Sequence, residues 1–146
     1  MIADVLKPAD FLLHTGEMLL VDRIIDSDCQ SYIVTEKDIH DSDFYLKGHF
    51  PGHPIVPGVF IVEMMFQTSG ILIRLLEENE NNGHLEKKGG RAVQIKSAVF
   101  KKEVPPNSII KITSHKRHSL LNFTEFAVQA TVDNEEVCST ILIISV

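Results

Sequence analysis

The chain has little that would suggest a secreted or disulfide-stabilised protein. Its 146 residues include only two cysteines, Cys29 and Cys138. They are far apart, in segments whose composition is typical of strands, so we expect small buried hydrophobic residues rather than a disulfide framework or a metal cluster. The first seven residues lack a basic stretch followed by a long apolar run. We therefore expect no secretory signal and a cytoplasmic protein.

The sequence also lacks a basic stripe. Its formal net charge is −6; residues 1–80 carry 5 Lys and Arg against 14 Asp and Glu (net −9), and residues 81–146 carry 9 against 6 (net +3). Too few cations lie together to neutralise many phosphates, which argues against a nucleic-acid-binding protein. The positive charge of the later half is concentrated in six residues: Lys87, Lys88, Arg91, Lys96, Lys101 and Lys102.

Length and composition indicate one globular domain over residues 1–146. Hydrophobic residues make up 44% of the chain. A chain of this size buries roughly 70% of the surface that its unfolded form exposes. We expect no second domain and find no internal repeat.

The longest apolar run, Val59–Leu76, predicts one long helix, with Pro57 just ahead of its first turn. Because the run is apolar on nearly all sides, the helix must be buried in protein or cross a membrane. A membrane span is disfavoured because Glu63 alone would cost about 2.5–3.5 kcal/mol at a helix centre. One narrow line of other residues interrupts the apolar surface and should face the site near Glu63 and solvent at its far end: Gln67, Gly70 and Arg74.

Strand patterns lie on both sides of this helix. We expect a short helix or loop over 11–20 leading into a first strand, a loop over 41–57 and a surface connection over 79–90. Turn signals at 105–107, 118–119 and 133–134 separate the later strands. The predicted strands cover residues 31–35, 92–100, 108–114, 123–132 and 137–146. This order predicts an α+β fold in which an antiparallel sheet wraps around one long central helix.

One motif stands at the start of the helix. Gly48-His49-Phe50-Pro51-Gly52 forms a loop, Pro57-Gly58 opens the helix, and Glu63 follows His49 by fourteen residues. This pattern resembles the signature of FabZ-type 3-hydroxyacyl-carrier-protein dehydratases. The resemblance extends to His14 with the later segment Met18–Arg23, and to Phe100-Lys101.

The resemblance implies the hotdog fold, at least a homodimer with active sites at its interface, and His49 and Glu63 as the acid/base pair. It implies a substrate carried as a 3-hydroxyacyl thioester on the phosphopantetheine arm of an acyl carrier protein, and a trans-2-enoyl thioester as product. It also places an oxyanion-binding amide at Gly58. No cofactor is implied.

The residue types fit this elimination. It needs a base for the C2 proton, an acid for the leaving hydroxide, and donors for the enolate-like oxygen. The imidazole of His49 exchanges protons near neutral pH, and the apolar surroundings of Glu63 should favour its protonated form. Gly58 lies at a helix start, where free amides favour negative charge. Gln67, one turn after Glu63, would orient that carboxyl group, bind water, or bond to a neighbouring strand.

A metal site is disfavoured. His49 and His53 are spaced as H-x-x-x-H, but Pro51-Gly52 between them prevents a helix from aligning the pair, and no Glu follows His49. We interpret His115 and His118 as solvated turn or strand residues.

Three departures from the family pattern affect which carrier protein and acyl chain we expect, but not which residues we expect to be catalytic. The segment His14–Glu17 replaces a usual His-Arg-Tyr/Phe-Pro, Val99 stands where an Arg is usual, and Pro106–Ser108 replaces Pro-Gly-Asp. The missing Arg belongs to a region implicated in carrier docking. A specialised lipid or polyene pathway is therefore as credible as fatty-acid synthesis. Carrier docking is nevertheless predicted for a basic set: Arg91, Lys96, Lys101 and Lys102.

Two other functions stay open. A hotdog thioesterase would use a carboxylate to activate water, and a non-catalytic acyl-binding module would not need both His49 and Glu63. The related FabA type, which also isomerises the double bond, typically has Asp at position 63, so Glu63 favours dehydration alone.

Overall fold

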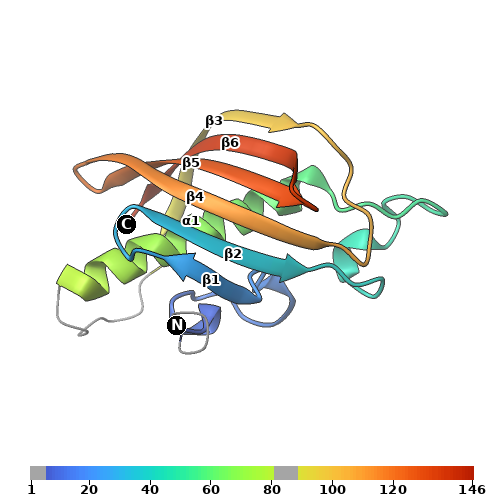
Figure 1. Cartoon of the computed structure of the whole chain (residues 1–146), viewed down its shortest axis with the longest axis horizontal. Helices are drawn as coiled ribbons and strands as arrows, with labels where there is room; N and C mark the ends of the chain where they lie inside the picture. The colour runs from blue at the N-terminus through green and yellow to red at the C-terminus, as the bar shows by residue number, and fades with distance from the viewer. Residues whose placement is uncertain (1–5, 81–88) are drawn as a thin grey trace.

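The computed structural model describes residues 6–80 and 89–146. Figure 1 shows a curved sheet with one long helix along one of its faces. Short 3-10 helices cover Pro8–Asp10, Gly16–Met18 and Phe44–Leu46. The longer elements, in chain order, are β1 (Arg23–Ser27), β2 (Tyr32–Asp38), α1 (Gly58–Glu80), β3 (Arg91–Phe100), β4 (Ile109–Leu120), β5 (Phe123–Val132) and β6 (Glu135–Ser145).

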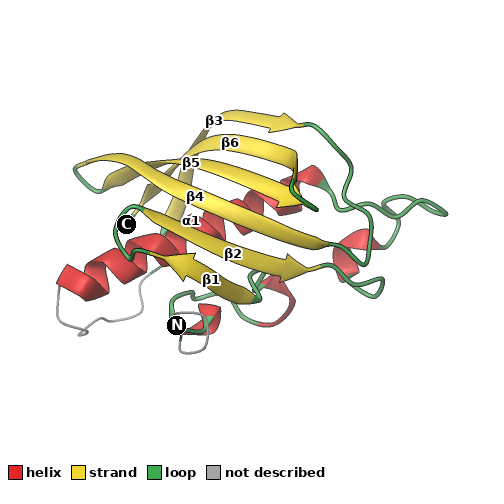
Figure 2. Cartoon of the chain, in the orientation of Figure 1, coloured by secondary structure: helices red, strands yellow, loops and turns green. Residues whose placement is uncertain are grey.

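The six strands form one antiparallel sheet in the order β1-β2-β4-β5-β6-β3 (Figure 2). The helix α1 contacts every strand from β2 to β6. The predicted α+β architecture, a sheet wrapped around one central helix, is confirmed.

Alternation of side chains along the strands builds the core. In β4, Ile110, Ile112 and Ser114 are buried, while Lys111 and His115 between and after them are exposed. Successive side chains of a strand point to opposite faces, so one face of β4 meets α1 and the other meets solvent. Burial of each such isoleucine stabilises the fold by about 1.5–3 kcal/mol.

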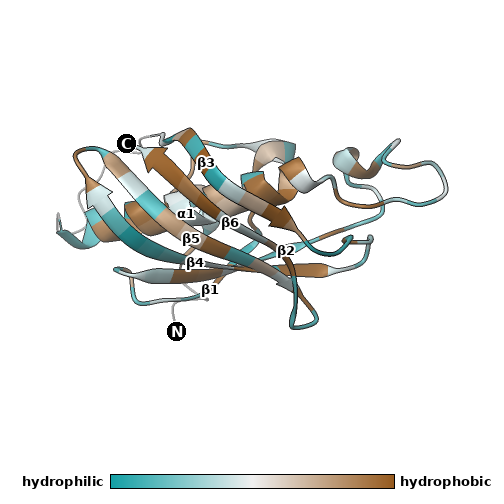
Figure 3. Ribbon diagram, turned by 90° about the horizontal axis from the view of Figure 1, so that it is seen from above, coloured by the Kyte–Doolittle hydropathy of each residue, from teal (hydrophilic) through white to brown (hydrophobic). Residues whose placement is uncertain are grey.

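The helix α1 is the centre of this core. Met64, Met65, Ile71 and Leu72 are fully buried in it, and Figure 3 colours much of the helix as hydrophobic. By length and composition α1 could cross a membrane, but 72% of its most apolar window is buried against the rest of the chain. Its apolar surface is therefore covered by the sheet, as expected for a core helix.

Two buried hydroxyl pairs fix α1 against the sheet. Thr68 Oγ1 lies 2.7 Å from Thr35 Oγ1 of β2, and Ser69 Oγ lies 2.7 Å from Ser114 Oγ of β4. Each hydroxyl satisfies the other in a place that water does not reach. These pairs set the rotation of α1 and thereby the direction in which Glu63 points.

Several local predictions need correction. The helix continues four residues beyond the expected Leu76, and β4 continues to Leu120, so the turn predicted at 118–119 lies inside a strand. The chain reverses instead at Leu121, where φ is 56°. Residues 115–119 are polar because most of their side chains are exposed, and not because the chain turns there. Cys29 is not in a strand either: it lies between β1 and β2 at φ 59° and is half-buried, whereas Cys138 is buried in β6 as expected.

Most of the predicted surface connection over 79–90, including Lys87 and Lys88, lies outside the described residues. At the other edge of the gap, Gly89 and Gly90 lead into β3.

Candidate active site

The loop that carries His49 is held by its own backbone. The His49 amide donates to Leu46 O at 3.1 Å, and the Ile55 amide donates to His49 O at 2.8 Å. Gly48 and Gly52 have φ values of 79° and 76°, which residues with a Cβ rarely adopt. The two glycines therefore permit the tight loop that the Gly-His-Phe-Pro-Gly pattern predicted.

The side chain of His49 has a defined orientation. Its Nδ1 lies 3.2 Å from the carbonyl oxygen of Ile55. A carbonyl can only accept, so Nδ1 carries the hydrogen and Nε2 keeps its lone pair. His49 lines a cavity of about 480 Å³ together with Gly58, Val59 and Phe100, hereafter the His49 cavity. A histidine held in this tautomer can accept a proton at Nε2.

Glu63 lies in the second turn of α1, and two other side chains contact the same oxygen of its carboxyl group. Gln67 Nε2 donates to Glu63 Oε1 at 2.9 Å, and His14 Nε2 lies 3.3 Å from that atom. The Glu63 side chain is 33% exposed in the single chain. It faces a cavity of about 150 Å³, hereafter the Glu63 cavity, whose wall includes Leu12, Phe66 and Gly70.

Gln67 ties this carboxylate to the N-terminal segment. Only 2% exposed, it also donates through Nε2 to Met18 O, and its Oε1 accepts from the Leu20 amide, both at 2.8 Å. Gln67 therefore contacts Glu63, and its other two partners lie in the segment before β1 rather than in a strand. Three bonds leave the Gln67 amide little freedom to turn.

His14 was not among the catalytic candidates chosen from the sequence. Its Nε2 faces Glu63, and its Nδ1 is buried without a hydrogen-bond partner among the described residues. A histidine that directly follows the apolar residues 11–13 was the available signal. The pattern could not show that this segment returns to α1 beside Glu63.

Gly58 begins α1 and lines the His49 cavity. The amides of Gly58 and Val59 make no backbone hydrogen bond within the described part of the chain. A Cβ at Gly58 would meet the ring of Phe100 at 2.6 Å, so glycine permits this close approach. The free amides at a helix start offer donors for a developing negative charge.

The chain does not bring His49 and Glu63 into one cavity. The His49 cavity is bounded by Phe100 and Lys101, where β3 ends, whereas the Glu63 cavity is bounded by Gly90 and Ala92, where β3 begins. The two halves of the expected acid/base pair therefore lie toward opposite ends of one edge strand.

The four basic residues expected to dock a carrier do not form one group. Lys101 and Lys102 line the His49 cavity and pair with Glu136 and Glu135. Lys96 pairs with Glu125, Nζ to Oε1 at 2.5 Å. That contact holds the pKa of Glu125 below its usual value.

Arg91, the fourth, lines a further cavity of about 280 Å³ at the start of β3. Arg74, expected to face solvent, is 5% exposed and pairs with Glu77 at 2.6 Å, so that expectation is wrong. His53 does not share a site with His49 and pairs with Glu103 at 2.9 Å.

Known proteins resemble this chain in sequence and in fold. The FabA-like domain model matches residues 12–141. The chain belongs to the FabA-like family. The matched range contains His14, His49, Glu63 and Gln67, which line the two cavities.

Curated relatives of this FabA-like protein are similar over most of their length. It is 32% identical to the 3-hydroxyacyl-[acyl-carrier-protein] dehydratase FabZ of Ruminiclostridium cellulolyticum over 126 residues, which covers 86% of this chain and 84% of the relative. It is 33% identical to the FabZ of Xylella fastidiosa strain M12 over 141 residues, which covers 95% and 86%. The predicted resemblance to FabZ-type proteins is confirmed.

Solved structures support the fold. The dehydratase heterocomplex ApeI:P from Xenorhabdus doucetiae matches with a TM-score of 0.78 at 18% identity, covering 96% of this chain and 90% of that one. The E. coli PaaI protein matches at 0.65 and 11% identity, covering 84% and 81%. The hotdog fold predicted for this FabA-like protein is confirmed.

Proposed function

We propose that this FabA-like protein is a dehydratase that converts a 3-hydroxyacyl thioester on an acyl carrier protein to the trans-2-enoyl thioester. The observation that supports the proposal is that hydrogen bonds fix the orientation of both candidate acid/base side chains. His49 donates through Nδ1 and keeps the lone pair of Nε2, and one carboxyl oxygen of Glu63 accepts from Gln67. FabZ relatives at 32–33% identity support the same reaction. A cytoplasmic location, and synthesis of fatty acids or of related lipids or polyenes, belong to this proposal.

Each group has one role in the elimination. His49 Nε2 takes the proton from C2, and the electron pair of that C–H bond forms the C2=C3 double bond. The C3–O bond breaks, and Glu63, in its acid form, gives its proton to the departing hydroxide, which leaves as water. Amides at the start of α1, beside Gly58, stabilise the charge that develops on the thioester oxygen.

In a single chain, His49 and Glu63 line separate cavities. The exposed edge of the sheet suggests how a second copy would bring the two residues into one site. All ten residues of β3 are exposed, including Val93, Ile95, Val99 and Phe100, and Figure 3 shows the hydrophobic end of the strand. A long exposed edge strand with apolar side chains is a template for pairing with another chain.

The proposed dimer pairs β3 with the β3 of a second copy in antiparallel fashion. Two-fold symmetry then sets the end of one β3 against the start of the other. Because His49 lies near the end and Glu63 near the start, each site receives His49 from one copy and Glu63 from the other. Mixing His49→Ala with Glu63→Gln subunits should restore part of the activity. Failure despite proven subunit exchange would contradict this shared site.

The reaction itself is tested by incubating the protein with a 3-hydroxyacyl carrier protein and measuring products. A dehydratase forms the enoyl thioester, seen by its ultraviolet absorbance, without release of free thiol. Release of thiol without enoyl product would favour the thioesterase alternative, in which Glu63 activates water. Binding of the substrate without either product would favour the non-catalytic acyl-binding module.

A further inference from the structure

Gly70 is a glycine in the interior of α1 that packing does not require. Glycine is less favourable than alanine inside a helix because it has more backbone freedom to lose. A Cβ at Gly70 would meet only Leu12 Cδ2 at 3.7 Å, an ordinary contact. By contrast, a Cβ at Gly90 would lie 2.9 Å from Ile144 Cγ2. The absence of a side chain at position 70 therefore needs another reason.

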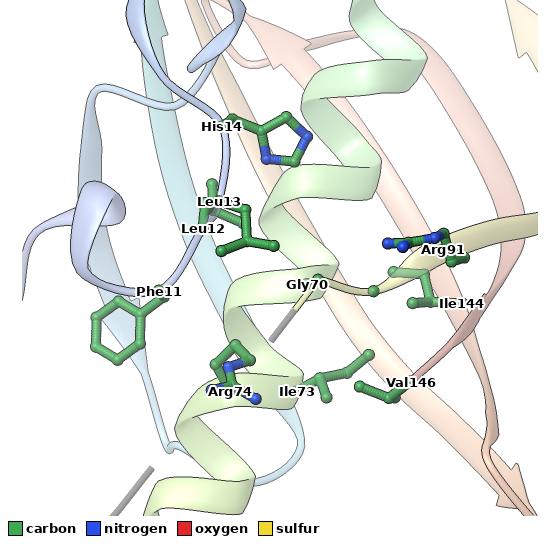
Figure 4. Close-up of a pocket in the computed structure, with 12 residues that line it drawn as sticks. Phe11, Leu12, Leu13, His14, Gly70, Ile73, Arg74, Arg91, Ile144 and Val146 are labelled. Atoms are coloured by element: carbon green, nitrogen blue, oxygen red, sulfur yellow. The ribbon is translucent and has the colours of Figure 1, made fainter. Parts of the chain in front are cut away.

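Two cavities adjoin Gly70. One is the Glu63 cavity, and the other, hereafter the distal cavity, is the space of about 280 Å³ that includes Arg91. Both have Gly70, Leu12 and Ile144 in their walls. Figure 4 shows His14 toward one end of this space and Ile73 and Val146 toward the other, with Gly70 between them.

The two cavities follow the axis of α1 away from Glu63. Seven residues of helix separate Glu63 from Gly70, a rise of about 10 Å that an extended chain of about eight methylene groups would span. Apolar side chains of Leu12, Ile73, Ile144 and Val146 supply much of the wall. Such a wall suits a hydrocarbon chain, which gains free energy in proportion to the apolar area that it buries.

We propose that Gly70 determines which acyl chains this protein accepts, by keeping open the passage from the Glu63 cavity to the distal cavity. The occupant is the acyl chain of the substrate, so the inference rests on the proposed function. Because Glu63 acts at C3, chains of about twelve carbons or more extend past Gly70 toward the distal cavity, whereas four-carbon chains end before it.

The test compares wild type, Gly70→Ala, Gly70→Leu and Val146→Phe on carrier-bound 3-hydroxyacyl substrates of four, eight and twelve carbons. Gly70→Leu should lower kcat/KM for twelve carbons by at least about 50-fold and change the four-carbon value by less than about 3-fold. Val146→Phe, which narrows only the far end, should affect twelve carbons alone. Gly70→Ala should lower the twelve-carbon value several-fold while raising Tm by about 3 °C.

The Gly70→Ala variant keeps the test decisive if the leucine variant does not fold. If Gly70→Ala raises Tm and lowers kcat/KM only for long acyl chains, Gly70 keeps a passage open and is not required for packing. Equal losses on four and twelve carbons, or no loss on twelve carbons, would overturn the role of Gly70 and leave the dehydratase function intact. A wild-type protein without dehydration of any chain length would instead overturn the proposed function, and the inference with it.

Discussion

The imidazole Nε2 of His14 lies 3.3 Å from Oε1 of Glu63 and joins the N-terminal segment to the central helix. The same oxygen accepts a hydrogen bond from Gln67, so both neighbours approach one side of the carboxyl group. In the proposed reaction, the other oxygen, Oε2, faces the substrate and transfers the proton. His14 and Gln67 would then act as positioning residues for Glu63.

His14→Leu should lower kcat by roughly 10-fold with little change in KM, because Glu63 loses one of its two neighbours but the binding surface stays apolar. His14→Gln should restore most of the rate, since its amide nitrogen can occupy the place of Nε2. His118→Leu, in the exposed part of β4, serves as the control. A glutamine variant as slow as the leucine variant would argue against positioning.

Gln67→Leu should reduce both activity and stability. The substitution leaves the Met18 carbonyl and the Leu20 amide without their partner, and each unsatisfied buried group costs about 1–3 kcal/mol. We expect a lower Tm and a kcat reduced by more than about 10-fold. Gln129→Leu, on the exposed side of β5, should change neither. A stable, fully active Gln67→Leu protein would contradict the role of the amide.

The sequence indicated the local parts of this site but not their assembly. The loop around His49 and the apolar run of α1 are contiguous patterns that were predictable from residue types, whereas the pairing of His49 with Glu63 was implied by the resemblance to FabZ-type dehydratases. The approach of His14 to Glu63 depends on the path of residues 11–20 back to the helix. That path is set by the Gln67 bonds to Met18 and Leu20, which no local pattern reveals.

Two other differences have local causes. Arg74 was expected in solvent as the far end of the polar line on α1, yet it is buried and pairs with Glu77. The pairing of β4 with β5 continues to Leu120 and Phe123, so the polar residues at 115–119 lie within a strand and not in a turn. The pairing of β4 with β5 sets the end of the strand, which the alternation of residue types alone does not show.

Carrier docking is expected to depend on the lysines at the His49 cavity. Lys101→Glu combined with Lys102→Glu should raise KM for carrier-bound substrate and weaken its salt dependence, because carrier proteins of this chemistry are acidic and salt screens such contacts over about 8 Å. A short pantetheine-linked substrate should be almost unaffected. Lys111→Glu, on an exposed position of β4, is the control.

The intramolecular partners of these lysines permit the opposite experiment. Glu135→Gln with Glu136→Gln frees the positive charge of Lys102 and Lys101 and should lower KM for the carrier-bound substrate. Equal losses of the lysine variant on both substrates would mean that the pair shapes the cavity or the fold, and the docking proposal would be withdrawn.

Stability at low pH should depend on Asp38. Two hydrogen bonds from the Arg23 guanidinium, both 2.7 Å, hold the pKa of this carboxyl below its usual value. Because the folded pKa is depressed, the pair stabilises the protein fully above the unfolded value of about 3.9 and loses that effect as pH falls through the folded value. Asp38→Asn should therefore lower Tm at pH 7, and its difference from wild type should shrink toward pH 3. Asp133→Asn, in the exposed turn before β6, should show no such trend.

The most direct measurement is the rate of enoyl thioester formation from a 3-hydroxyacyl carrier protein by His49→Ala and Glu63→Gln, each checked for folding by its Tm. Loss of either acid/base group should lower turnover by a factor on the order of 10² to 10⁴. The double variant should be little slower than the singles, since both groups act in one elimination. Near wild-type turnover by either single variant would contradict the assignment of His49 and Glu63 as the catalytic pair.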